Sequence, residues 1–498
     1  MGAGGGLTRK IGIVAAGRAA NTFSVLAVTV LIADAWTRDQ CGLFAAVWVL
    51  GNALVPIFLL GLPTSVLYFF PRWQNPRALT GQAAFCLLVS GGLLVGVLQL
   101  WGPQLSVWLT ENAGHAAALD RYLWPFLPYV FSLVAGGYAE AALVASGRET
   151  WAAALQLALG VGLVVGGVAA LFFGWSPVEV LTFFSVLGLM RLVVAGWLVY
   201  RALGGGGGWW TGERFGELIA YTRPIGFNDA VGSLSRYIDR FVVMFAFGAG
   251  ATFAEYHFGA LEVPVSLLLA AVVTVLVPEI SRLFQAGRLD DIHALWQGAV
   301  SRLALVVLPL FAFLLVFAEP LISLLYPDYA RSIWVFRIYI LVLPLRCAIY
   351  NPLLVGMGKA RWALWGSLGD LGCNLALSLA LVSYLLGARP EWAFLGPALA
   401  TVCSTYLQVI FLLTAIGRHL RWGLAQLLPW GQLLRLGLGA AGAALASRWL
   451  GAGVGGDFWQ LAAGGVCFVG LMGVLVWTNP HDRAQWKQTL AALLGSRS

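Results

Sequence analysis

The chain has 498 residues, of which 60% are hydrophobic and only 10% are charged, whereas soluble domains carry about 25% charged residues. Arginine supplies almost all of the positive charge behind the net charge of +8, because Lys10, Lys359 and Lys487 are the only lysines. These values exclude an ordinary soluble domain. The basic residues are scattered singly between apolar runs, which argues against a nucleic-acid partner.

Runs of about twenty apolar residues recur along the whole sequence, as expected for helices that cross a membrane. The predicted fold class is an all-α integral membrane protein with about fourteen transmembrane helices. Their expected positions are 11–33, 41–70, 80–101, 119–145, 151–173, 177–200, 218–247, 256–278, 298–318, 333–357, 362–386, 392–416, 430–449 and 458–477.

The connections between these helices differ in charge: one set holds sixteen Lys and Arg residues and the other holds five. By the positive-inside rule, this difference predicts that both termini are cytoplasmic. We expect an N-terminal lobe at 1–200 and a C-terminal lobe at 218–417. A cytoplasmic glycine-rich linker with an interfacial segment should join them at 201–217, and the last two helices and a tail should follow at 418–498.

The first predicted helix contains Arg18, with Asn21 close by. Arg18 is a candidate for the wall of a polar cavity, although it could instead extend to the cytoplasmic surface of the membrane. Glu140, in the fourth helix, could either neutralise an arginine or bind a coupling proton or sodium ion. No role is predicted for Arg191. After the seventh and eighth helices, residues 279–298 predict a separate cytoplasmic surface helix with its apolar side chains on one face.

The seventh helix is apolar enough to cross a membrane, yet the part of it at 225–247 carries four charged side chains. Asp229, Ser233, Arg236 and Arg240 fall on one narrow stripe, and Asp239 lies beside it. Four ionisable residues facing lipid would cost about 10 to 14 kcal/mol, so we expect the stripe to line a wet cavity. Two arginines four residues apart favour an anionic ligand. The alternative is an internal ion pair with the two aspartates.

Two later helices carry further polar groups. Arg346 lies near the middle of the tenth helix, where it cannot easily reach the membrane surface. In the eleventh helix, Ser367, Asp370, Asn374 and Ser378 repeat on one face. Asp370 could neutralise an arginine, or it could bind a coupling proton or sodium ion.

Several segments resemble polysaccharide and O-antigen flippases of the multidrug, oligosaccharidyl-lipid and polysaccharide exporter superfamily. They are GLPTSVLYFFPR at 61–72, VPEISRLFQAGRLDD at 277–291, LPL and LLYPDYARS within 308–332, and GMGKARWAL at 356–364. The resemblance covers about residues 8–420. It implies two six-helix lobes arranged as a V around a central cavity, two extra C-terminal helices, alternating access and a sugar substrate linked to lipid pyrophosphate.

The sequence therefore predicts a transporter in the bacterial inner membrane that flips an undecaprenyl-pyrophosphate-linked oligosaccharide for polysaccharide export. Arg18, Arg236, Arg240 and Arg346 are the predicted pyrophosphate ligands. Asp370, Asn374, Asp239, Asp229 and Asn21 are further polar or ion-coupling candidates. Membrane lipids and a coupling H⁺ or Na⁺ are the other expected partners.

The alternatives are a lipid II flippase or a drug exporter of the same superfamily. A membrane-embedded glycan polymerase, ligase or acyltransferase is disfavoured, because the connections are short and the five histidines are dispersed. The six cysteines lack C-x-x-C spacing, so no metal site and no cofactor are expected.

Overall fold

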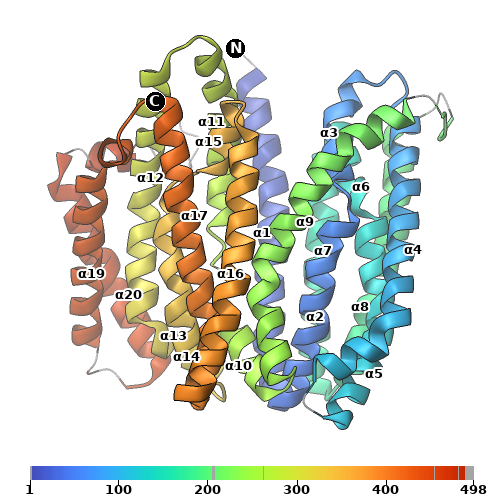
Figure 1. Ribbon diagram of the computed structural model, residues 1–498, viewed down its shortest axis with the longest axis horizontal. Helices are drawn as coiled ribbons and strands as arrows, with labels where there is room; N and C mark the ends of the chain where they lie inside the picture. Colours follow the sequence, from blue (N-terminus) through green and yellow to red (C-terminus); the bar gives the residue numbers. More distant parts are fainter. Residues whose placement is uncertain are drawn as a thin grey trace. The chain divides into compact units, whose positions relative to one another are not determined.

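The computed structural model describes residues 3–110, 112–204, 208–212, 214–261, 263–451, 453, 455–480 and 482–487. These residues form helices and the turns between them, and none of them lies in a β-strand (Figure 1). Eleven stretches of the described chain are helical, long and apolar enough to cross a membrane. The prediction of an all-α integral membrane protein is confirmed.

The chain packs into two compact units, Met1–His257 and Phe258–Ser498. The last residues of α10 belong to the second unit. The helices of the first unit are α1 (Ala3–Ala35), α2 (Arg38–Phe58), α3 (Leu62–Phe69), η1 (Phe70–Arg72), α4 (Pro76–Trp108), α5 (Ala113–Ala135), α6 (Gly137–Ala145), α7 (Glu149–Phe173), α8 (Pro177–Leu203), α9 (Phe215–Phe247) and α10 (Ala251–Gly259).

The second unit contains the remaining helices. They are α11 (Ser266–Gln285), α12 (Leu289–Val316), α13 (Ala318–Leu325), α14 (Ser332–Tyr339), η2 (Ile340–Cys347), α15 (Asn351–Gly356), α16 (Ala360–Ala388), η3 (Pro390–Leu395), α17 (Gly396–Leu420), α18 (Leu424–Leu427), α19 (Trp430–Gly451) and α20 (Asp457–Thr478). The lobe boundaries expected from the sequence stay predictions.

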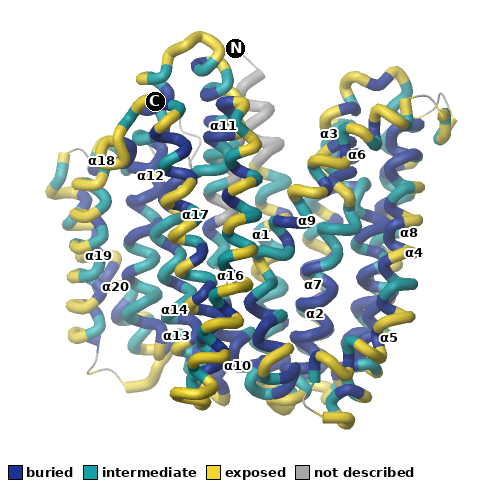
Figure 2. The backbone as a smooth tube through the Cα atoms, viewed as in Figure 1, coloured by how far each residue is buried: buried dark blue, intermediate teal, exposed yellow. Residues whose placement is uncertain are grey.

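The eleven apolar stretches coincide with eleven of the fourteen predicted membrane helices. The other three correspond to α9, to α10 with α11, and to α19, which are helical but outside the eleven. Large apolar side chains lie exposed on the helices; Trp449 is 78% exposed and Phe173 77%. Figure 2 marks the exposed positions along the helices of each unit. Such surfaces suit a hydrocarbon surrounding, where exposed apolar groups carry no penalty.

Small residues hold α1 against α7 in the first unit. A Cβ on Gly17 would lie 2.9 Å from the Cα of Ala153, and one on Gly160 would lie 2.7 Å from the hydroxyl oxygen of Ser24. Glycine therefore permits the two backbones to approach, as is typical of helix contacts in membranes. This contact fixes the position of Arg18, which directly follows Gly17.

The second predicted membrane helix is broken where α2 ends and α3 begins. Leu60 has φ +54° and Gly61 has φ +72°, both in the left-handed region. Helix α9 packs against this break, and a Cβ on Gly226 would lie 2.7 Å from the carbonyl carbon of Leu60. Thr222 on α9 donates a hydrogen bond of 2.8 Å to Ser65 on α3. The break is thus part of the contact that seats α9 in the first unit.

The connection between α8 and α9 contacts the N-terminal part of α4 through Gly208, Trp209 and Thr211. The side chain of Asn75 donates to the carbonyl of Gly208 (3.1 Å), and that of Gln82 donates to the carbonyl of Thr211 (2.5 Å). A Cβ on Gly81 would meet the carbonyl oxygen of Trp209 at 1.8 Å, so only glycine fits there. The expected glycine-rich linker includes five consecutive glycines at 204–208, of which residues 205–207 lie outside the described part.

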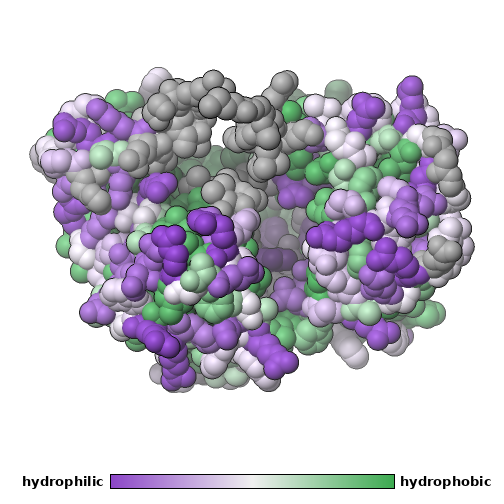
Figure 3. Space-filling view, turned by 90° about the horizontal axis from the view of Figure 1, so that it is seen from above, coloured by the Kyte–Doolittle hydropathy of each residue, from purple (hydrophilic) through white to green (hydrophobic). Residues whose placement is uncertain are grey.

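Arginine and aromatic side chains are in contact at the end of the first unit where α8 connects to α9. The guanidinium carbon of Arg72 lies 4.2 Å from the Tyr68 ring centre, and that of Arg214 lies 4.6 Å from the Trp73 ring centre. Figure 3 shows hydrophilic residues gathered on the face of this unit that contains these helix ends. Such residues suit a membrane–water boundary. The cytoplasmic assignment of this end stays a prediction.

The separate surface helix predicted at 279–298 is wrong. Helix α11 continues to Gln285, Gly287 turns the chain with φ +72°, and α12 begins at Leu289. The expected apolar side chains do share a side, because Ile280 and Trp296 are both fully buried in one hydrophobic cluster. Helices α11 and α12 bury this apolar face inside the second unit, so the face does not lie on a lipid surface.

The tenth predicted membrane helix is interrupted. Between α14 and α15 the chain forms the 3₁₀ segment η2 and then an extended residue, Ala348. The indole of Trp296 donates to the carbonyl of Ile349 (3.2 Å), and the hydroxyl of Tyr406 donates to the carbonyl of Leu341 (2.9 Å). These bonds satisfy carbonyl groups at and near the break, which irregular backbone at membrane depth requires.

Helices α19 and α20 pack on α12 and α13. Ala440 and Ala444 of α19 are fully buried in a cluster with Ala312 of α12 and Phe468 of α20. A Cβ on Gly464 would lie 2.4 Å from the ring of Phe317, so the ring packs directly on the α20 backbone. The last two helices are therefore an integral part of the second unit.

Candidate functional site

The side chains of the charged stripe on α9 differ in how deeply they are buried. Ser233 is fully buried and donates a hydrogen bond of 2.8 Å to the carbonyl of Ala53 on α2. Arg240, two turns further, is 5% exposed, whereas Arg236 is exposed and Asp229 is half-buried. The four side chains share a face as predicted, but their surroundings differ.

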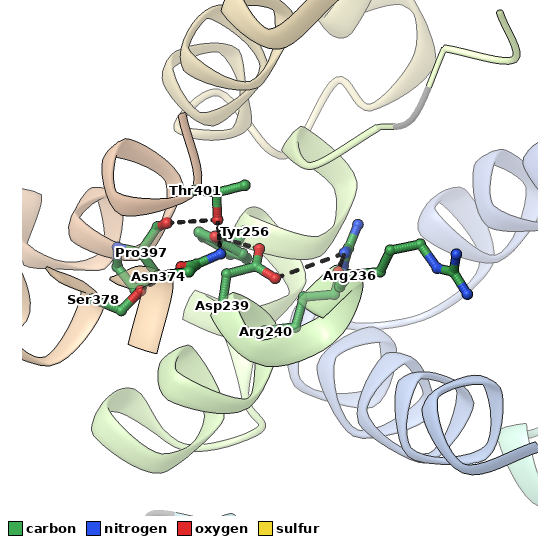
Figure 4. A network of polar contacts seen from close by, with 8 residues as sticks. All are labelled: Arg236, Asp239, Arg240, Tyr256, Asn374, Ser378, Pro397 and Thr401. Carbon is green, nitrogen blue, oxygen red and sulfur yellow. Dashed lines mark hydrogen bonds and ion pairs between the residues drawn. The ribbon is translucent and has the colours of Figure 1, made fainter. Parts of the chain in front are cut away.

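Arg240 belongs to a buried polar cluster with Asp239 and Tyr256, shown in Figure 4. Its Nη1 lies 3.9 Å from Oδ1 of Asp239, which is 1% exposed, and donates to the carbonyl of Arg236 at 2.9 Å. The hydroxyl of Tyr256, on α10, donates to Oδ2 of Asp239 at 2.7 Å. This arrangement is the internal ion pair that the sequence left open for Arg240.

Arg236 differs from Arg240 in that its guanidinium forms no hydrogen bond or ion pair with the residues that the structure describes. Figure 4 shows its side chain extending away from Asp239 and Tyr256. Asp229 is close enough to interact with it electrostatically, but the two groups form no salt bridge. Of the two arginines in the charged stripe of α9, Arg236 is therefore the one whose guanidinium is available to an anionic ligand.

Arg18 is bound to a carboxylate that the sequence did not connect with it. Its Nε and Nη2 lie 2.8 and 2.6 Å from Oε1 of Glu140 on α6. Gln156 on α7 donates to Oε2 of the same carboxylate at 2.6 Å. The Oδ1 of Asn21, one turn from Arg18, is buried and accepts no hydrogen bond from the described residues. Arg18 thus sits in a polar cluster of the first unit.

In the second unit, Arg346 and Asp370 are in different surroundings. Arg346 lies in η2, is exposed, and has no hydrogen bond or ion pair to the described residues. Asp370 is half-buried on α16. The roles of both as substrate or ion ligands stay predictions.

Asn374 is buried between α16 and α17. Its amide nitrogen donates to the hydroxyl of Thr401 (3.1 Å), and its amide oxygen accepts from Ser378 (3.0 Å), as drawn in Figure 4. The Thr401 hydroxyl in turn donates to the carbonyl of Pro397 at 3.0 Å. The stripe on α16 therefore serves at least to join two helices.

Tyr256 and Thr401 were missed by the sequence analysis because each lies on a different helix from the group it contacts. Nothing in the local periodicity of either helix indicates the partner. Among the described residues, no group of three His, Cys, Asp or Glu side chains could hold a metal ion.

No curated protein matches the sequence. A family model described as lipid II flippase MurJ matches residues 141–332. Among solved structures, lipid II flippase MurJ in an inward closed conformation superimposes with a TM-score of 0.70 at 13% identity, over 93% of this chain and 99% of that one.

The fold is that of the MOP-superfamily transporters. A MOP-superfamily transporter from Pyrococcus furiosus superimposes with a TM-score of 0.62 at 13% identity, over 84% of this chain and 95% of that one. An inward-facing multidrug resistance MATE family transporter gives 0.63 at 14% identity, over 80% and 94%. The fold that the resemblance implied is thus found, whereas membership of the superfamily and of its polysaccharide branch stays a prediction.

Proposed function

We propose that the protein is a flippase that moves a lipid carrying a pyrophosphate-linked saccharide across the bacterial inner membrane, with both termini in the cytoplasm. The observation that carries the proposal is the exposed guanidinium of Arg236, which has no partner among the described residues and lies in a long helix of a transporter fold. An ionised side chain in a membrane helix costs about 2.5 to 3.5 kcal/mol unless water or a ligand contacts it. A transported anion would supply such a contact.

The chemistry of the headgroup explains why arginine would be used. A pyrophosphate must cross about 30 Å of hydrocarbon while it remains charged. The planar guanidinium offers two parallel N–H donors that match two phosphate oxygens, so Arg236 and Arg18 could replace part of the lost hydration. In our proposal Arg240 positions the end of α9 through Asp239, and Arg346 is a further substrate contact.

Lipid II is the favoured substrate. The MurJ family model matches residues 141–332, and the MurJ structure covers nearly the whole chain, which supports lipid II more directly than an O-antigen precursor. A cationic drug is disfavoured, because a cation would require acidic side chains where α9 presents Arg236. Polysaccharide export, favoured by the sequence motifs, is the second candidate.

Complementation distinguishes the two substrates. The full chain would be expressed in a strain depleted of its lipid II flippase and, separately, in a strain that lacks its O-antigen flippase. Growth of the first strain supports lipid II, and restored surface polysaccharide in the second supports O-antigen. Failure in both strains, with the protein present in the membrane, would contradict the proposal.

The role of Arg236 has a matched control on the same helix. Arg236→Ala should abolish complementation, while Arg236→Lys should retain part of it because lysine keeps the charge but loses the two-pronged geometry. Arg223, also exposed on α9, provides the control variant Arg223→Ala, which should complement normally. Equal loss in Arg236→Ala and Arg223→Ala would show that only general surface charge matters.

A further inference from the structure

The polar cluster around Glu140 joins four helices of the first unit. Arg18 comes from α1, Glu140 from α6, Gln156 from α7 and Arg191 from α8. Close backbone contact between α1 and α7 at Gly17 holds Arg18 in reach of the carboxylate. The cluster therefore has a built framework and is not a chance contact of flexible side chains.

The charges of this cluster do not balance. Both oxygens of Glu140 are already engaged, Oε1 by Arg18 and Oε2 by Gln156. Arg191 interacts electrostatically with the same carboxylate, yet its buried Nε has no hydrogen-bond partner among the described residues. One carboxylate thus faces two guanidinium groups, which leaves one positive charge and one buried donor unmatched.

The exposure of Arg18 and Glu140 indicates how a ligand could enter. The side chain of Arg18 is 60% exposed, whereas that of Glu140 is 20% exposed. Arg18 can therefore turn toward an incoming anion, while Glu140 stays within the helix bundle. Carboxylate and phosphate oxygens bind guanidinium in the same geometry, so one can replace the other.

We propose that Glu140 is a resident counter-ion that occupies an anion site built from Arg18 and Arg191, and that a phosphate group takes its place during transport. The inference rests on the proposed function and adds to it a residue that sets substrate affinity and release. Glu140 neutralises one of the two positive charges when no substrate is present. It then competes for them and so assists departure of the phosphate.

The test uses the purified full chain in detergent and measures binding of farnesyl pyrophosphate and of inorganic pyrophosphate, with farnesol as the uncharged probe. Glu140→Gln removes the competing charge and should tighten binding of both pyrophosphates by about tenfold. Arg191→Gln should weaken binding by about tenfold. In a reconstituted flipping assay, Glu140→Gln should lower kcat and KM together, which a purely structural role would not do.

Glu279→Gln is the matched control, because Glu279 also accepts hydrogen bonds from an arginine, Arg282, but lies at the exposed end of α11. It should change no binding constant. If Glu140→Gln is not monodisperse, Glu140→Asp provides the second variant; its shorter side chain withdraws from Arg18 and should also tighten binding.

The outcomes separate the two proposals. Unchanged or weaker pyrophosphate binding by the Glu140 variants, with weaker binding by Arg18→Gln, overturns the counter-ion role and leaves the flippase proposal intact. Absence of pyrophosphate binding by the unmodified protein contradicts the flippase proposal itself. Tighter binding of farnesyl than of inorganic pyrophosphate assigns the site to a lipid headgroup, and the reverse order overturns that assignment.

Discussion

Arg236 and Arg240 lie four residues apart on α9, and their replacement by alanine should affect different properties. Arg240→Ala should lower the stability of the protein, whereas Arg236→Ala should lower transport. Arg240 is buried, and its Nη1 is 3.9 Å from the Asp239 carboxylate, so with an effective dielectric constant of about 20 their attraction is about 4 kcal/mol. Removal of one partner from a buried pair costs about 3 to 5 kcal/mol, because the other charge stays buried. We therefore expect Arg240→Ala to destabilise the protein by that amount.

Arg236→Ala should leave stability within about 0.5 kcal/mol, because the side chain is exposed and lacks a partner among the described residues. Its effect should appear in transport alone. Thermal unfolding in detergent and membrane abundance measure the first property, and complementation at matched protein levels measures the second. The double variant Arg240→Gln with Asp239→Asn should recover much of the stability lost by Arg240→Ala, since no isolated charge remains.

Two results would refute this reasoning. One is an Arg240→Ala variant as stable as the unmodified protein, which would show that the pair contributes nothing to the fold. The other is an Arg236→Ala variant whose transport falls only in proportion to its abundance. A fully active variant with Arg236, Arg240, Asp229 and Asp239 all neutralised would also exclude substrate binding by these arginines.

Three further outcomes are expected. Gly226→Ala should destabilise the protein by about 1 to 3 kcal/mol, because a Cβ there meets backbone of the α2–α3 break at 2.7 Å; thermal unfolding measures the change. Gly81→Ala should displace the connection between α8 and α9 from α4. A cysteine placed in that connection should then be labelled more readily. Asp370→Asn should reduce transport and its dependence on H⁺ or Na⁺ gradients while leaving membrane abundance normal.

Matched controls accompany these variants. Gly232 on α9 and Gly92 on α4 have open space where a Cβ would lie, so Gly232→Ala and Gly92→Ala should be neutral or slightly stabilising. A Gly226→Ala protein that unfolds at the same temperature as Gly232→Ala would contradict the close contact. Unaltered labelling in Gly81→Ala would contradict the close contact between Gly81 and the connection. Unaltered ion dependence in Asp370→Asn would contradict a coupling role for Asp370.

Helix positions were predictable because apolar runs of membrane length leave few alternatives. Helix α9, which corresponds to the seventh predicted helix, was expected at 218–247 and is found at Phe215–Phe247. Breaks were harder, because an apolar run continues through them. The strongest local sign of the break after α2 was Gly61 followed by Pro63, and the turn that replaces the expected surface helix was marked by Gly287.

The site was predictable only as far as one helix determines it. Periodicity placed Ser233, Arg236 and Arg240 on one face of α9, but it could not show that α2 covers Ser233 and leaves Arg236 exposed. The pairing of Arg18 with Glu140 joins residues 122 positions apart, and no local pattern reports such a contact. Side-chain environments depend on which helices are neighbours, and the sequence pattern of a single helix does not contain that information.

The seating of α9 on α2 and α3 also bears on how the polypeptide could be divided. A second fragment that began at Gly208 would carry its own docking segment, since Gly208 and Thr211 accept hydrogen bonds from α4 and α9 packs on α3 through Thr222. Two separately synthesised pieces would therefore share a common packed core, despite the missing peptide bond. The glycine run, where the chain could most easily be cut, lies before α9. The boundary between the two compact units lies after α9, at His257, so the two boundaries do not coincide.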